Sequence, residues 1–335
     1  MRIAIVTDAW HPQVNGVVRT LEAVRDQLLL NGHDVSIISP DRFRSLPCPT
    51  YPDIRLSCSP HRVIWQHLEA ADPDAVHIST EGPLGVAARR WCLRNGFPFT
   101  TAYHTQFPEY LSRRTGFPAK LFWRYIQWFH RPARRILVAT ETLSRQLCAQ
   151  GLAQTSLWTR GVDLASFHPN VPPHPTLAAL PRPIQLYVGR VAVEKNLEAF
   201  LSSEVAGSKV VIGDGPELER LKKLYPQARF PGALTGSELA SAYTAADVFV
   251  FPSRTDTFGL VIIEALASGV PVAAFPVPGP ADILTDDLGA MDECLSNAIE
   301  RALAKDKSPC AAHAAGYNWS ASARQFEGAL VSMMG

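Results

Sequence analysis

Two acidic residues frame a segment that could bind a phosphorylated ligand. Asp256 stands in a polar loop, and Glu264 follows eight residues later in a stretch rich in helix-forming residues. Eight residues are a little over two helical turns, so the two carboxylates can face the same side. Between them, the backbone N–H groups of Phe258, Gly259 and Leu260 would lie at the N-terminus of the helix, which is a favourable place for an anion.

This segment lies between two predicted strands. The apolar run 247–251 precedes the loop, Gly269 and Pro271 end the helix, and another strand begins immediately. A loop that follows a strand in this way lies at the carboxyl edge of a parallel sheet, where ligands of open α/β sheets bind. The order strand, loop, helix, strand therefore places the two acids at a ligand-binding edge.

A pair of basic residues follows another predicted strand, 184–188. Gly189 and Arg190 come directly after this strand, and Lys195 is predicted to begin the next helix. Two cations near one helix N-terminus suit a diphosphate, because a guanidinium can bind two oxygens at once and an ammonium adds a compact charge. The alternative interpretation is an ordinary pair of surface charges on a loop.

Glycines end other predicted strands. Gly16 separates the first strand, 2–6, from an amphipathic helix, and a strand, a glycine and a helix N-terminus together can accept a phosphate. Gly213 and Gly215 form a tight turn after the strand 209–212. The sequence has no Gly-x-Gly-x-x-Gly, so we expect no nicotinamide cofactor.

Two further motifs lie at predicted strand ends. His104 follows the strand 99–102, where a histidine can take part in chemistry or bind sugar hydroxyls, although it could also be a turn residue. Asp72 and Asp74 have the spacing of a metal-binding Asp-x-Asp pair. They enclose a proline and directly precede the strand 75–78, which favours a turn, so we expect no metal site.

The segment 252–272 resembles the Glu-x7-Glu signature of retaining nucleotide-sugar glycosyltransferases of family 4, which have the GT-B fold. The first acid of this sequence is Asp256, one methylene shorter than Glu. The resemblance extends over the whole chain and implies two Rossmann-like, doubly wound parallel-sheet domains that face a central cleft. It implies an acceptor-binding domain over 1–167, a nucleotide-sugar-binding domain over 168–317, and a last helix within 318–335 that packs back on the first domain.

The resemblance also implies roles for individual residues. Arg190 and Lys195 would neutralise the leaving nucleoside diphosphate, and Glu264 would hold the ribose hydroxyls. Asp256 would bind sugar hydroxyls, while His104 would contact the donor sugar and help to position the acceptor. Neither a metal nor a cofactor would be required. The other donor-binding residues would be Gly16, Gly189, Gly213, Gly215, Phe258, Gly259 and Leu260, and the acceptor cleft would be bordered by Thr105, Phe107 and Tyr110.

Length and composition are compatible with two domains. A chain of 335 residues can bury two cores, and the alternation of strand and helix patterns predicts parallel sheets. The proline-rich stretch 169–183 is predicted to be a stiff linker between the domains. The formal net charge is +1, which gives no reason to expect nucleic-acid binding. The six cysteines lack metal-ligand spacing, and we expect reduced thiols in a cytoplasmic protein.

Basic and aromatic residues concentrate in the first half of the chain. Residues 1–165 carry 19 Lys and Arg against 13 Asp and Glu, a net of +6, whereas residues 166–335 carry 13 against 18, a net of −5. Such a domain could face anionic lipid, or the imbalance could be an ordinary fluctuation. The segment 120–136 could dock at a lipid headgroup interface, but aromatics at this spacing are also typical of a core. Its members are Phe122, Tyr125, Ile126 and Phe129, with Arg124, Arg131, Arg134 and Arg135.

The identity of the acceptor is inferred only from the resemblance to this family. The segments 7–20, 103–110 and 189–200 are most similar to lipid-directed members of the family. These are glucuronosyl- or sulfoquinovosyl-diacylglycerol synthases and GDP-mannose-dependent α-mannosyltransferases. We therefore expect a UDP- or GDP-linked sugar as donor and a membrane lipid such as diacylglycerol as acceptor. The protein would be peripheral on the cytoplasmic face of the inner membrane, since no apolar run is long enough to span a bilayer.

Two other classes stay open at this point. A nucleotide-sugar epimerase of the same fold would need no acceptor site. A non-catalytic sugar- or lipid-binding relative would be expected to lack the basic pair, so the presence of Arg190 and Lys195 argues against it. The sequence identifies neither the donor base nor the oligomeric state.

Overall fold

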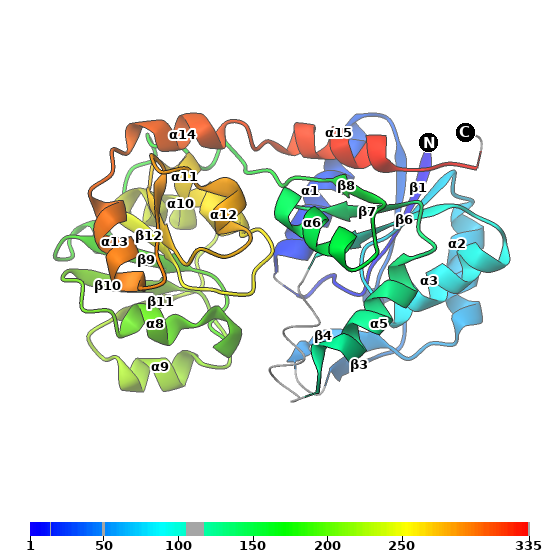
Figure 1. Ribbon diagram of the computed structural model, residues 1–335, viewed down its shortest axis with the longest axis horizontal. Coiled ribbons are helices and arrows are strands. Elements are labelled where there is room, and N and C mark those ends of the chain that lie inside the picture. Colours follow the sequence, from blue (N-terminus) through cyan, green and yellow to red (C-terminus); the bar gives the residue numbers. More distant parts are fainter. Residues whose placement is uncertain (14, 49–50, 105–116, 334–335) are drawn as a thin grey trace. The chain divides into compact units, whose positions relative to one another are not determined.

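The computed structural model describes residues 1–13, 15–48, 51–104 and 117–333. The chain divides into two compact units, shown in Figure 1: unit 1 contains Met1–Arg160 and Trp319–Gly335, and unit 2 contains Gly161–Asn318. The division comes after Arg160 and not after residue 167, the predicted boundary. The physical reason is that the intervening segment packs on unit 2, where the backbone N–H of Val162 donates to the carbonyl of Tyr317 at 3.0 Å.

Unit 1 is built on a six-stranded sheet with the order β2-β1-β5-β6-β7-β8, and every pairing is parallel. A hairpin of two antiparallel strands, β3 and β4, was not predicted. The strands of the unit are β1 (Arg2–Val6), β2 (Asp34–Ile38), β3 (Ser45–Cys48), β4 (Tyr51–Ser57), β5 (Ala75–Ile78), β6 (Phe99–Tyr103), β7 (Arg135–Val138) and β8 (Thr155–Leu157). Its helices are α1 (Gly16–Leu30), the 3-10 helix η1 (Pro40–Arg42), α2 (His61–Ala71), α3 (Pro83–Arg94), α5 (Ala119–His130), α6 (Glu141–Ala149) and α15 (Trp319–Ala329).

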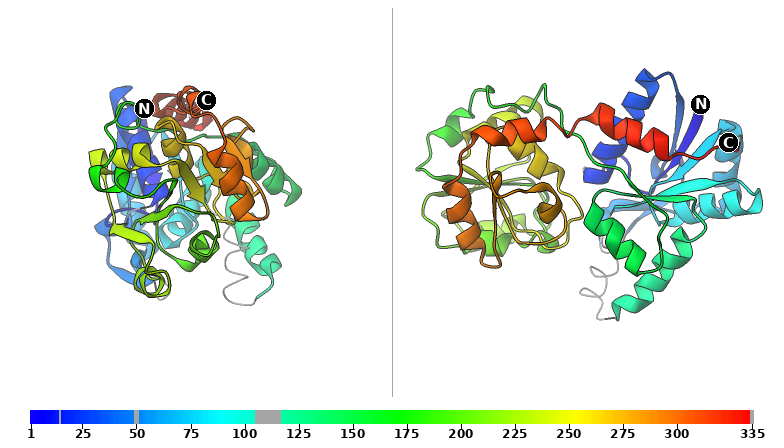
Figure 2. Two further views of the ribbon diagram at one scale, coloured as in Figure 1. Left: turned by 90° about the vertical axis from the view of Figure 1, so that its left-hand side faces the viewer. Right: turned by 45° about the horizontal axis from the view of Figure 1, so that its top comes forward.

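Both faces of this sheet are covered by helices, as Figure 2 shows. Alternate residues of a strand point to opposite faces, and β1 illustrates the result. Ala4 and Val6 pack in a cluster with α2, α3 and the end of α5, whereas Ile3 and Ile5 pack in a cluster with α1 and α15. Phe326 brings α15, from the far end of the sequence, into the second cluster. A parallel sheet buried on both faces explains the apolar strand runs in the sequence.

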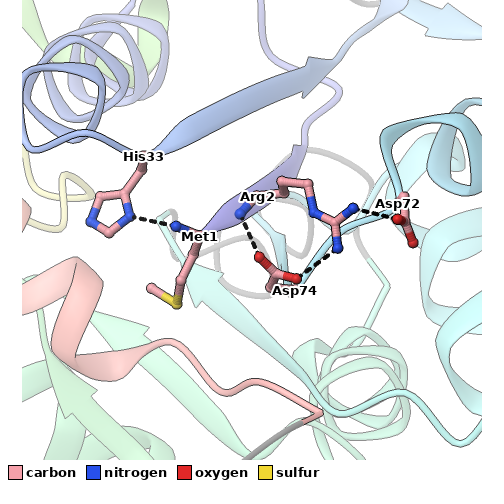
Figure 3. Close-up of polar contacts among 5 residues, drawn as sticks. All are labelled: Met1, Arg2, His33, Asp72 and Asp74. Atoms are coloured by element: carbon pink, nitrogen blue, oxygen red, sulfur yellow. Dashed lines mark hydrogen bonds and ion pairs between the residues drawn. The ribbon is translucent and has the colours of Figure 1, made fainter.

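The Asp-x-Asp motif is part of an ion-pair cluster at the amino end of β1 and β5. Figure 3 shows both carboxylates turned toward the guanidinium of Arg2, which donates to Asp72 and, at 2.9 Å, to Asp74. The backbone N–H of Arg2 also donates to Asp74 at 2.8 Å. Asp72 has a positive φ of 39°, as the end residue of a helix often does. The motif therefore joins two strands at the edge opposite the predicted ligand site.

Unit 2 is built on a second six-stranded parallel sheet, with the order β11-β10-β9-β12-β13-β14. Val248 and Val250 pack with α8, α9 and α13 on one face, while Phe249 meets Tyr243 of α10 on the other. The strands are β9 (Ile184–Val188), β10 (Ser208–Ile212), β11 (Arg229–Gly232), β12 (Val248–Phe251), β13 (Val272–Ala274) and β14 (Gly289–Met291). The helices are α7 (Pro175–Ala178), the 3-10 helix η2 (Val193–Lys195), α8 (Leu197–Leu201), α9 (Leu218–Leu224), α10 (Gly236–Ala245), α11 (Leu260–Ala267), α12 (Pro280–Ile283), α13 (Leu295–Leu303) and α14 (Ser308–Ala314).

Residues 169–183, predicted to be a linker, belong to unit 2. The backbone N–H of His174 donates to the carbonyl of Ser241 at 2.8 Å, and Leu177 of α7 is buried. The ring of Phe167, just before this stretch, lies 5.8 Å from that of Tyr243. The prolines therefore stiffen a segment that packs on the unit.

None of the helices in the described ranges is long and apolar enough to cross a membrane. The five cysteines whose side chains are described are free thiols, namely Cys58, Cys92, Cys148, Cys294 and Cys310.

Candidate active site

Lys195 and Asp256 form an ion pair at the carboxyl edge of the unit 2 sheet. The ammonium donates to both oxygens of the carboxylate, at 2.6 and 2.8 Å, and each side chain is about a quarter exposed. The two residues follow β9 and β12, which are neighbouring parallel strands, so their loops leave the sheet at the same edge. An ammonium has three donors, and two of them are directed at Asp256. The third can donate to a ligand oxygen.

The backbone around Lys195 differs from the predicted helix start. Lys195 ends the short helix η2, and Asn196 then adopts a left-handed conformation with φ 55° before α8 begins. Asparagine tolerates this conformation better than most residues. The left-handed turn at Asn196 separates η2 from α8. The Asn196 side chain donates to the carbonyl of Pro252 at 3.1 Å. That bond joins the loops that carry the two members of the ion pair, so Asn196 helps to hold them together.

Arg190 directly follows Gly189, and a buried tyrosine fixes its backbone. The Tyr187 hydroxyl donates to the Arg190 carbonyl at 2.8 Å, and a Cβ at Gly189 would lie only 2.8 Å from that hydroxyl. Burial raises the pKa of Tyr187 well above its usual value, and the charges of Asp256 and Glu194 raise it further. Tyr187 therefore stays a neutral donor. No spacing in the sequence indicated this residue.

Gly213 allows the loops after β9 and β10 to touch. It has φ 141°, and a Cβ there would lie 1.8 Å from the Gly189 carbonyl oxygen. A hydrogen bond of 2.8 Å from the Val191 N–H to the Asp214 carbonyl joins the same two loops. Gly215 is crowded in the same way, since its Cβ would lie 2.3 Å from the Val191 carbonyl oxygen. These glycines therefore have a packing role, and their predicted contact with the donor stays a prediction.

The N-terminus of α11 begins at Leu260, after Gly259 with φ 93°. Phe258 is 5% exposed and packs against Tyr317, so only its backbone can meet a ligand. A Cβ at Gly279 would lie 2.9 Å from the Phe258 carbonyl oxygen, so this glycine lets the loop after β13 approach. Gly279 was not predicted as a site residue, although the glycine between two prolines marked a turn.

Glu264 lies inside α11 and is 3% exposed. Its Oε2 accepts a hydrogen bond of 2.9 Å from the hydroxyl of Tyr243, which comes from α10 and is fully buried. Asp256, by contrast, lies in the loop before α11, so the helix carries only one of the two acids. No local pattern in the sequence indicated Tyr243. The role of Glu264 toward the ribose stays a prediction.

Gly16 and His104 belong to unit 1. Gly16 is the first residue of α1, and the Asn15 side chain caps that helix by accepting from the N–H groups of Val17 and Val18, both at 3.0 Å. A phosphate would have to compete with Asn15 for these two donors. The binding of a diphosphate at Gly16 therefore has less support from the local structure than from the sequence.

His104 directly follows β6 and is held by Arg160, a residue that was not predicted. The guanidinium donates to Nδ1 of His104 at 3.1 Å, and the imidazole lies edge-on to the Trp158 ring, with 5.6 Å between centroids. Burial lowers the pKa of His104 well below 6.5, and the charges of Arg160, His77 and His130 lower it further. The imidazole is therefore neutral at neutral pH.

Thr105, Phe107 and Tyr110 lie outside the described residues. Within the described part of the chain, no group of three or more His, Cys, Asp or Glu side chains could hold a metal ion.

Known proteins resemble the chain along most of its length. Residues 14–166 match the model of Glycosyltransferase Family 4, and residues 182–306 match that of Glycosyl transferases group 1. A GDP-mannose-dependent alpha-mannosyltransferase of Mycobacterium tuberculosis is 34% identical over 310 residues, which cover 85% of this chain and 82% of that protein. The chain is a family 4 glycosyltransferase. Sulfoquinovosyl transferase SQD2 of Arabidopsis thaliana is 36% identical to this glycosyltransferase, over 73% of the chain and 51% of SQD2.

Solved structures give the fold of this family 4 glycosyltransferase. A sucrose-phosphate synthase from Thermosynechococcus elongatus superposes with a TM-score of 0.78 at 22% identity, covering 97% of both chains. Anabaena HepE in complex with UDP superposes with a TM-score of 0.71 at 14% identity, covering 98% of this chain and 99% of HepE. With its two parallel α/β sheets, the glycosyltransferase has the GT-B fold.

Proposed function

We propose that this glycosyltransferase moves a sugar from a UDP- or GDP-linked donor to the hydroxyl of a membrane lipid such as diacylglycerol, with retention of the anomeric configuration. The observation that carries the proposal is the Lys195–Asp256 pair at the carboxyl edge of the unit 2 sheet. A cation held in place by a carboxylate suits a reaction in which negative charge develops on a leaving phosphate.

The donor end of the reaction needs charge stabilisation. Lys195 uses its third N–H, and Arg190 its guanidinium, to bind the β-phosphate as the glycosidic bond breaks. Asp256 orients the ammonium and offers its lone pairs to a sugar hydroxyl, and Glu264 holds the ribose. The backbone N–H groups at the start of α11 face the same diphosphate. The basic side chains supply the countercharge, so the reaction proceeds without a metal ion.

The anomeric configuration is retained if the diphosphate departs from, and the acceptor hydroxyl attacks, the same face of the sugar. The acceptor hydroxyl approaches the anomeric carbon from the side that the diphosphate leaves, and a phosphate oxygen takes its proton. The leaving group then carries one proton, and the acceptor oxygen carries the sugar. This route needs no side chain as a base.

The lipid acceptor is supported by the exposed face of α5. Leu121, Tyr125 and Trp128 recur at spacings of four and three residues and are 52%, 42% and 42% exposed, while Ile126 and Phe129 face the core. The exposed basic residues Lys120, Arg124 and Arg131 flank this stripe. A helix with apolar and basic residues on its outer face suits the surface of an anionic bilayer. An alpha-monoglucosyldiacylglycerol synthase of Streptococcus pneumoniae is 27% identical over 90% of the chain, which agrees with such an acceptor.

A second candidate function is GDP-mannose-dependent α-mannosyl transfer to another glycolipid or to a saccharide. The mannosyltransferase of Mycobacterium tuberculosis favours it, because that relative is 34% identical over 85% of the chain. The two candidates share the donor-end chemistry and differ in the sugar and the acceptor.

A donor screen tests the proposal. The protein is incubated with UDP-glucose, UDP-glucuronic acid or GDP-mannose and with vesicles of a bacterial lipid extract, and the lipids are analysed by mass spectrometry. We expect one donor to give a lipid heavier by the one sugar residue that this donor carries, with an equal amount of nucleoside diphosphate. Nucleoside diphosphate release that needs a soluble saccharide and leaves every lipid unchanged would favour the second candidate. A donor isomer formed without acceptor would instead indicate an epimerase.

A further inference from the structure

Arg160 is a buried cation that faces a histidine. It is 5% exposed, and it donates hydrogen bonds to two neutral acceptors, the Trp158 carbonyl at 2.7 Å and Nδ1 of His104 at 3.1 Å. Burial lowers the pKa of Arg160 to about 9, so the guanidinium is still charged at neutral pH. Keeping a charge inside a protein is costly, and such a residue usually has a specific task.

The chemistry of the two groups determines which imidazole nitrogen carries the proton. A guanidinium has donors and no acceptor, so Nδ1 of His104 must offer its lone pair. In a neutral imidazole the proton is then on Nε2. A second proton on Nδ1 would place two cations in contact. Among the described residues, His77 and His130 also disfavour a positive charge on His104.

A helix from the far end of the chain keeps Arg160 in place. The guanidinium lies over the Trp158 ring at 4.4 Å from the centroid. Trp158 donates to the Ser322 hydroxyl of α15 at 3.1 Å, and that hydroxyl donates to the Thr159 carbonyl at 2.7 Å. Gln325, one turn further along α15, accepts from both the N–H and the hydroxyl of Thr159 at 2.8 Å. The two residues that precede Arg160 are therefore held to α15 by hydrogen bonds.

We propose that Arg160 is a positioning residue that fixes His104 as the Nε2–H tautomer, so that His104 serves glycosyl transfer as a hydrogen-bond donor to a substrate oxygen and not as a base. The role in transfer rests on the proposed function, whereas the tautomer does not. A base at this position would need Nε2 without a proton, which the contact with Arg160 opposes.

Nuclear magnetic resonance of the imidazole nitrogens tests the tautomer without substrate. In wild-type protein labelled with ¹⁵N-histidine, long-range ¹H–¹⁵N spectra distinguish the protonated nitrogen, and His104→Gln identifies the signals. We expect protonated Nε2 in the wild type and in Arg160→Lys, and mixed tautomers in Arg160→Met. Wild-type protein with the proton on Nδ1 of His104 overturns the proposal, even if neither Arg160 variant folds.

A matched control separates positioning from stability. Arg89 is also buried, lies 4.1 Å from the centroid of the Trp128 ring and donates to the carbonyls of Trp128 and Phe129. Arg89→Met should lower Tm while leaving the His104 tautomer unchanged. Arg160→Met should lower kcat at least tenfold more than Arg89→Met does. Equal losses of kcat, or an unchanged tautomer in Arg160→Met, would contradict the proposal.

Two substitutions of His104 test the donor role. The glutamine amide can replace an Nε2–H donor, whereas alanine cannot, so we expect His104→Gln to retain at least ten times the kcat of His104→Ala. Equal activity of the two variants would mean that His104 does not act as a donor. If the wild type transfers no sugar from any donor, the proposed function fails, and the spectra still decide the tautomer.

Discussion

Among single residues, the proposed charge stabilisation depends on how firmly Lys195 is held. An exposed lysine samples many conformations, but two hydrogen bonds from Lys195 to Asp256 restrict this ammonium. Both side chains are about a quarter exposed, so solvent screens the pair and its contribution to stability is small. The pair therefore matters for the placement of charge more than for folding.

Removing either basic residue should slow turnover while the fold persists. We expect Lys195→Ala and Arg190→Ala each to lower kcat at least tenfold, because a group that stabilises transition-state charge is typically worth ~2.7–4 kcal/mol. Lys222→Ala is the control, since Lys222 is a partly exposed residue of unit 2 that pairs with Glu219 on α9. Steady-state kinetics and a melting curve for each variant are the measurements. If both site variants keep wild-type kcat, the diphosphate is bound elsewhere.

Asp8 makes the stability of unit 1 depend on pH. This buried carboxylate accepts hydrogen bonds from the N–H groups of Leu84 and Gly85, at 2.9 and 3.3 Å, and from the Thr80 hydroxyl at 2.9 Å. Burial outweighs these bonds and raises its pKa from 3.8 to about 6. The folded protein thus binds this proton more readily than the unfolded chain does.

The sign of the pH effect follows from that raised pKa. Asp8 contributes stability below pH 4 that is lost as pH rises through about 6, and a shift from 3.8 to about 6 corresponds to about 3 kcal/mol. Urea unfolding of the wild type and of Asp8→Asn between pH 4 and pH 7 measures this contribution of Asp8 to the free energy of unfolding. The other titrating groups are common to both proteins, so the difference between the two pH profiles reports Asp8. The wild type should lose more stability than the variant over this range. Parallel pH profiles would contradict the raised pKa.

Single residues also show how far sequence reasoning reaches at a site. Spacing after predicted strands indicated Arg190, Lys195 and Asp256, because each lies between the end of a predicted strand and the first turn of the next helix. The contact between Lys195 and Asp256 could not be predicted, since it requires β9 and β12 to be neighbours. Tyr243 and Arg160 were missed for a related reason. Each acts through one hydrogen bond to a residue distant in sequence, and no local pattern marks such a partner.

At the scale of elements, α5 has two different faces. Arg89 of α3 binds the carbonyls of Trp128 and Phe129, which holds the C-terminal turn of α5 against unit 1. The aromatic spacing in the sequence was compatible with either a core or a lipid interface. In the structure one side of the helix packs in the core and the other is exposed, with Ile126 buried and Leu121 exposed.

The outer face of α5 should control binding to vesicles. We expect Leu121→Gln to weaken binding at every salt concentration, because an exposed leucine gains ~1.5–3 kcal/mol when it is buried. The double substitution Arg124→Gln and Arg131→Gln should mainly remove the salt-sensitive part of vesicle binding, at ~1 kcal/mol of binding free energy for each residue. Co-sedimentation with vesicles that contain anionic lipid, at low and high salt, is the measurement.

Leu30→Gln is the matched control for the leucine substitution, since Leu30 is 78% exposed at the end of α1. It should leave vesicle binding unchanged. Arg135 is excluded from the set because its guanidinium donates to the Gly328 carbonyl near the end of α15, so its loss would disturb packing. Wild-type protein that ignores anionic vesicles at low salt would make a soluble acceptor the better proposal.

Regular elements were predicted more reliably than the connections between them. The buried strand runs and their alternation with helices implied parallel pairing, and both six-stranded sheets are parallel. The helix predicted to start at 194–196 is interrupted because Asn196 turns left-handed. The proline-rich segment 169–183 packs on unit 2. This packing could not be predicted, because proline content indicates that a segment is stiff but not which surface it contacts.

At the scale of the whole molecule, each unit holds different predicted site residues. Unit 2 contains Arg190, Lys195, Asp256 and Glu264, and unit 1 contains Gly16 and His104. The return of α15 to unit 1 means that the chain passes from unit 1 to unit 2 and back. Predicted site residues therefore occur in both units.

Activity should not depend on a metal ion. The proposal assigns the neutralisation of phosphate charge to Lys195 and Arg190, so an excess of EDTA should leave the rate of transfer within twofold of the untreated rate. Transfer from the active donor to vesicle lipid is measured before and after chelation. Loss of activity that Mg²⁺ or Mn²⁺ restores would contradict the proposed charge stabilisation.

The stereochemistry of the product distinguishes retaining transfer to a lipid from the alternative reactions. The active donor is incubated with diacylglycerol vesicles, the purified glycolipid is examined by ¹H nuclear magnetic resonance of its anomeric proton, and a parallel reaction omits the vesicles. We predict a glycolipid with the anomeric configuration of the donor, formed in the same amount as nucleoside diphosphate and only when vesicles are present. A product of inverted configuration, or a new nucleotide-sugar isomer in the reaction without vesicles, would contradict retaining transfer to a lipid.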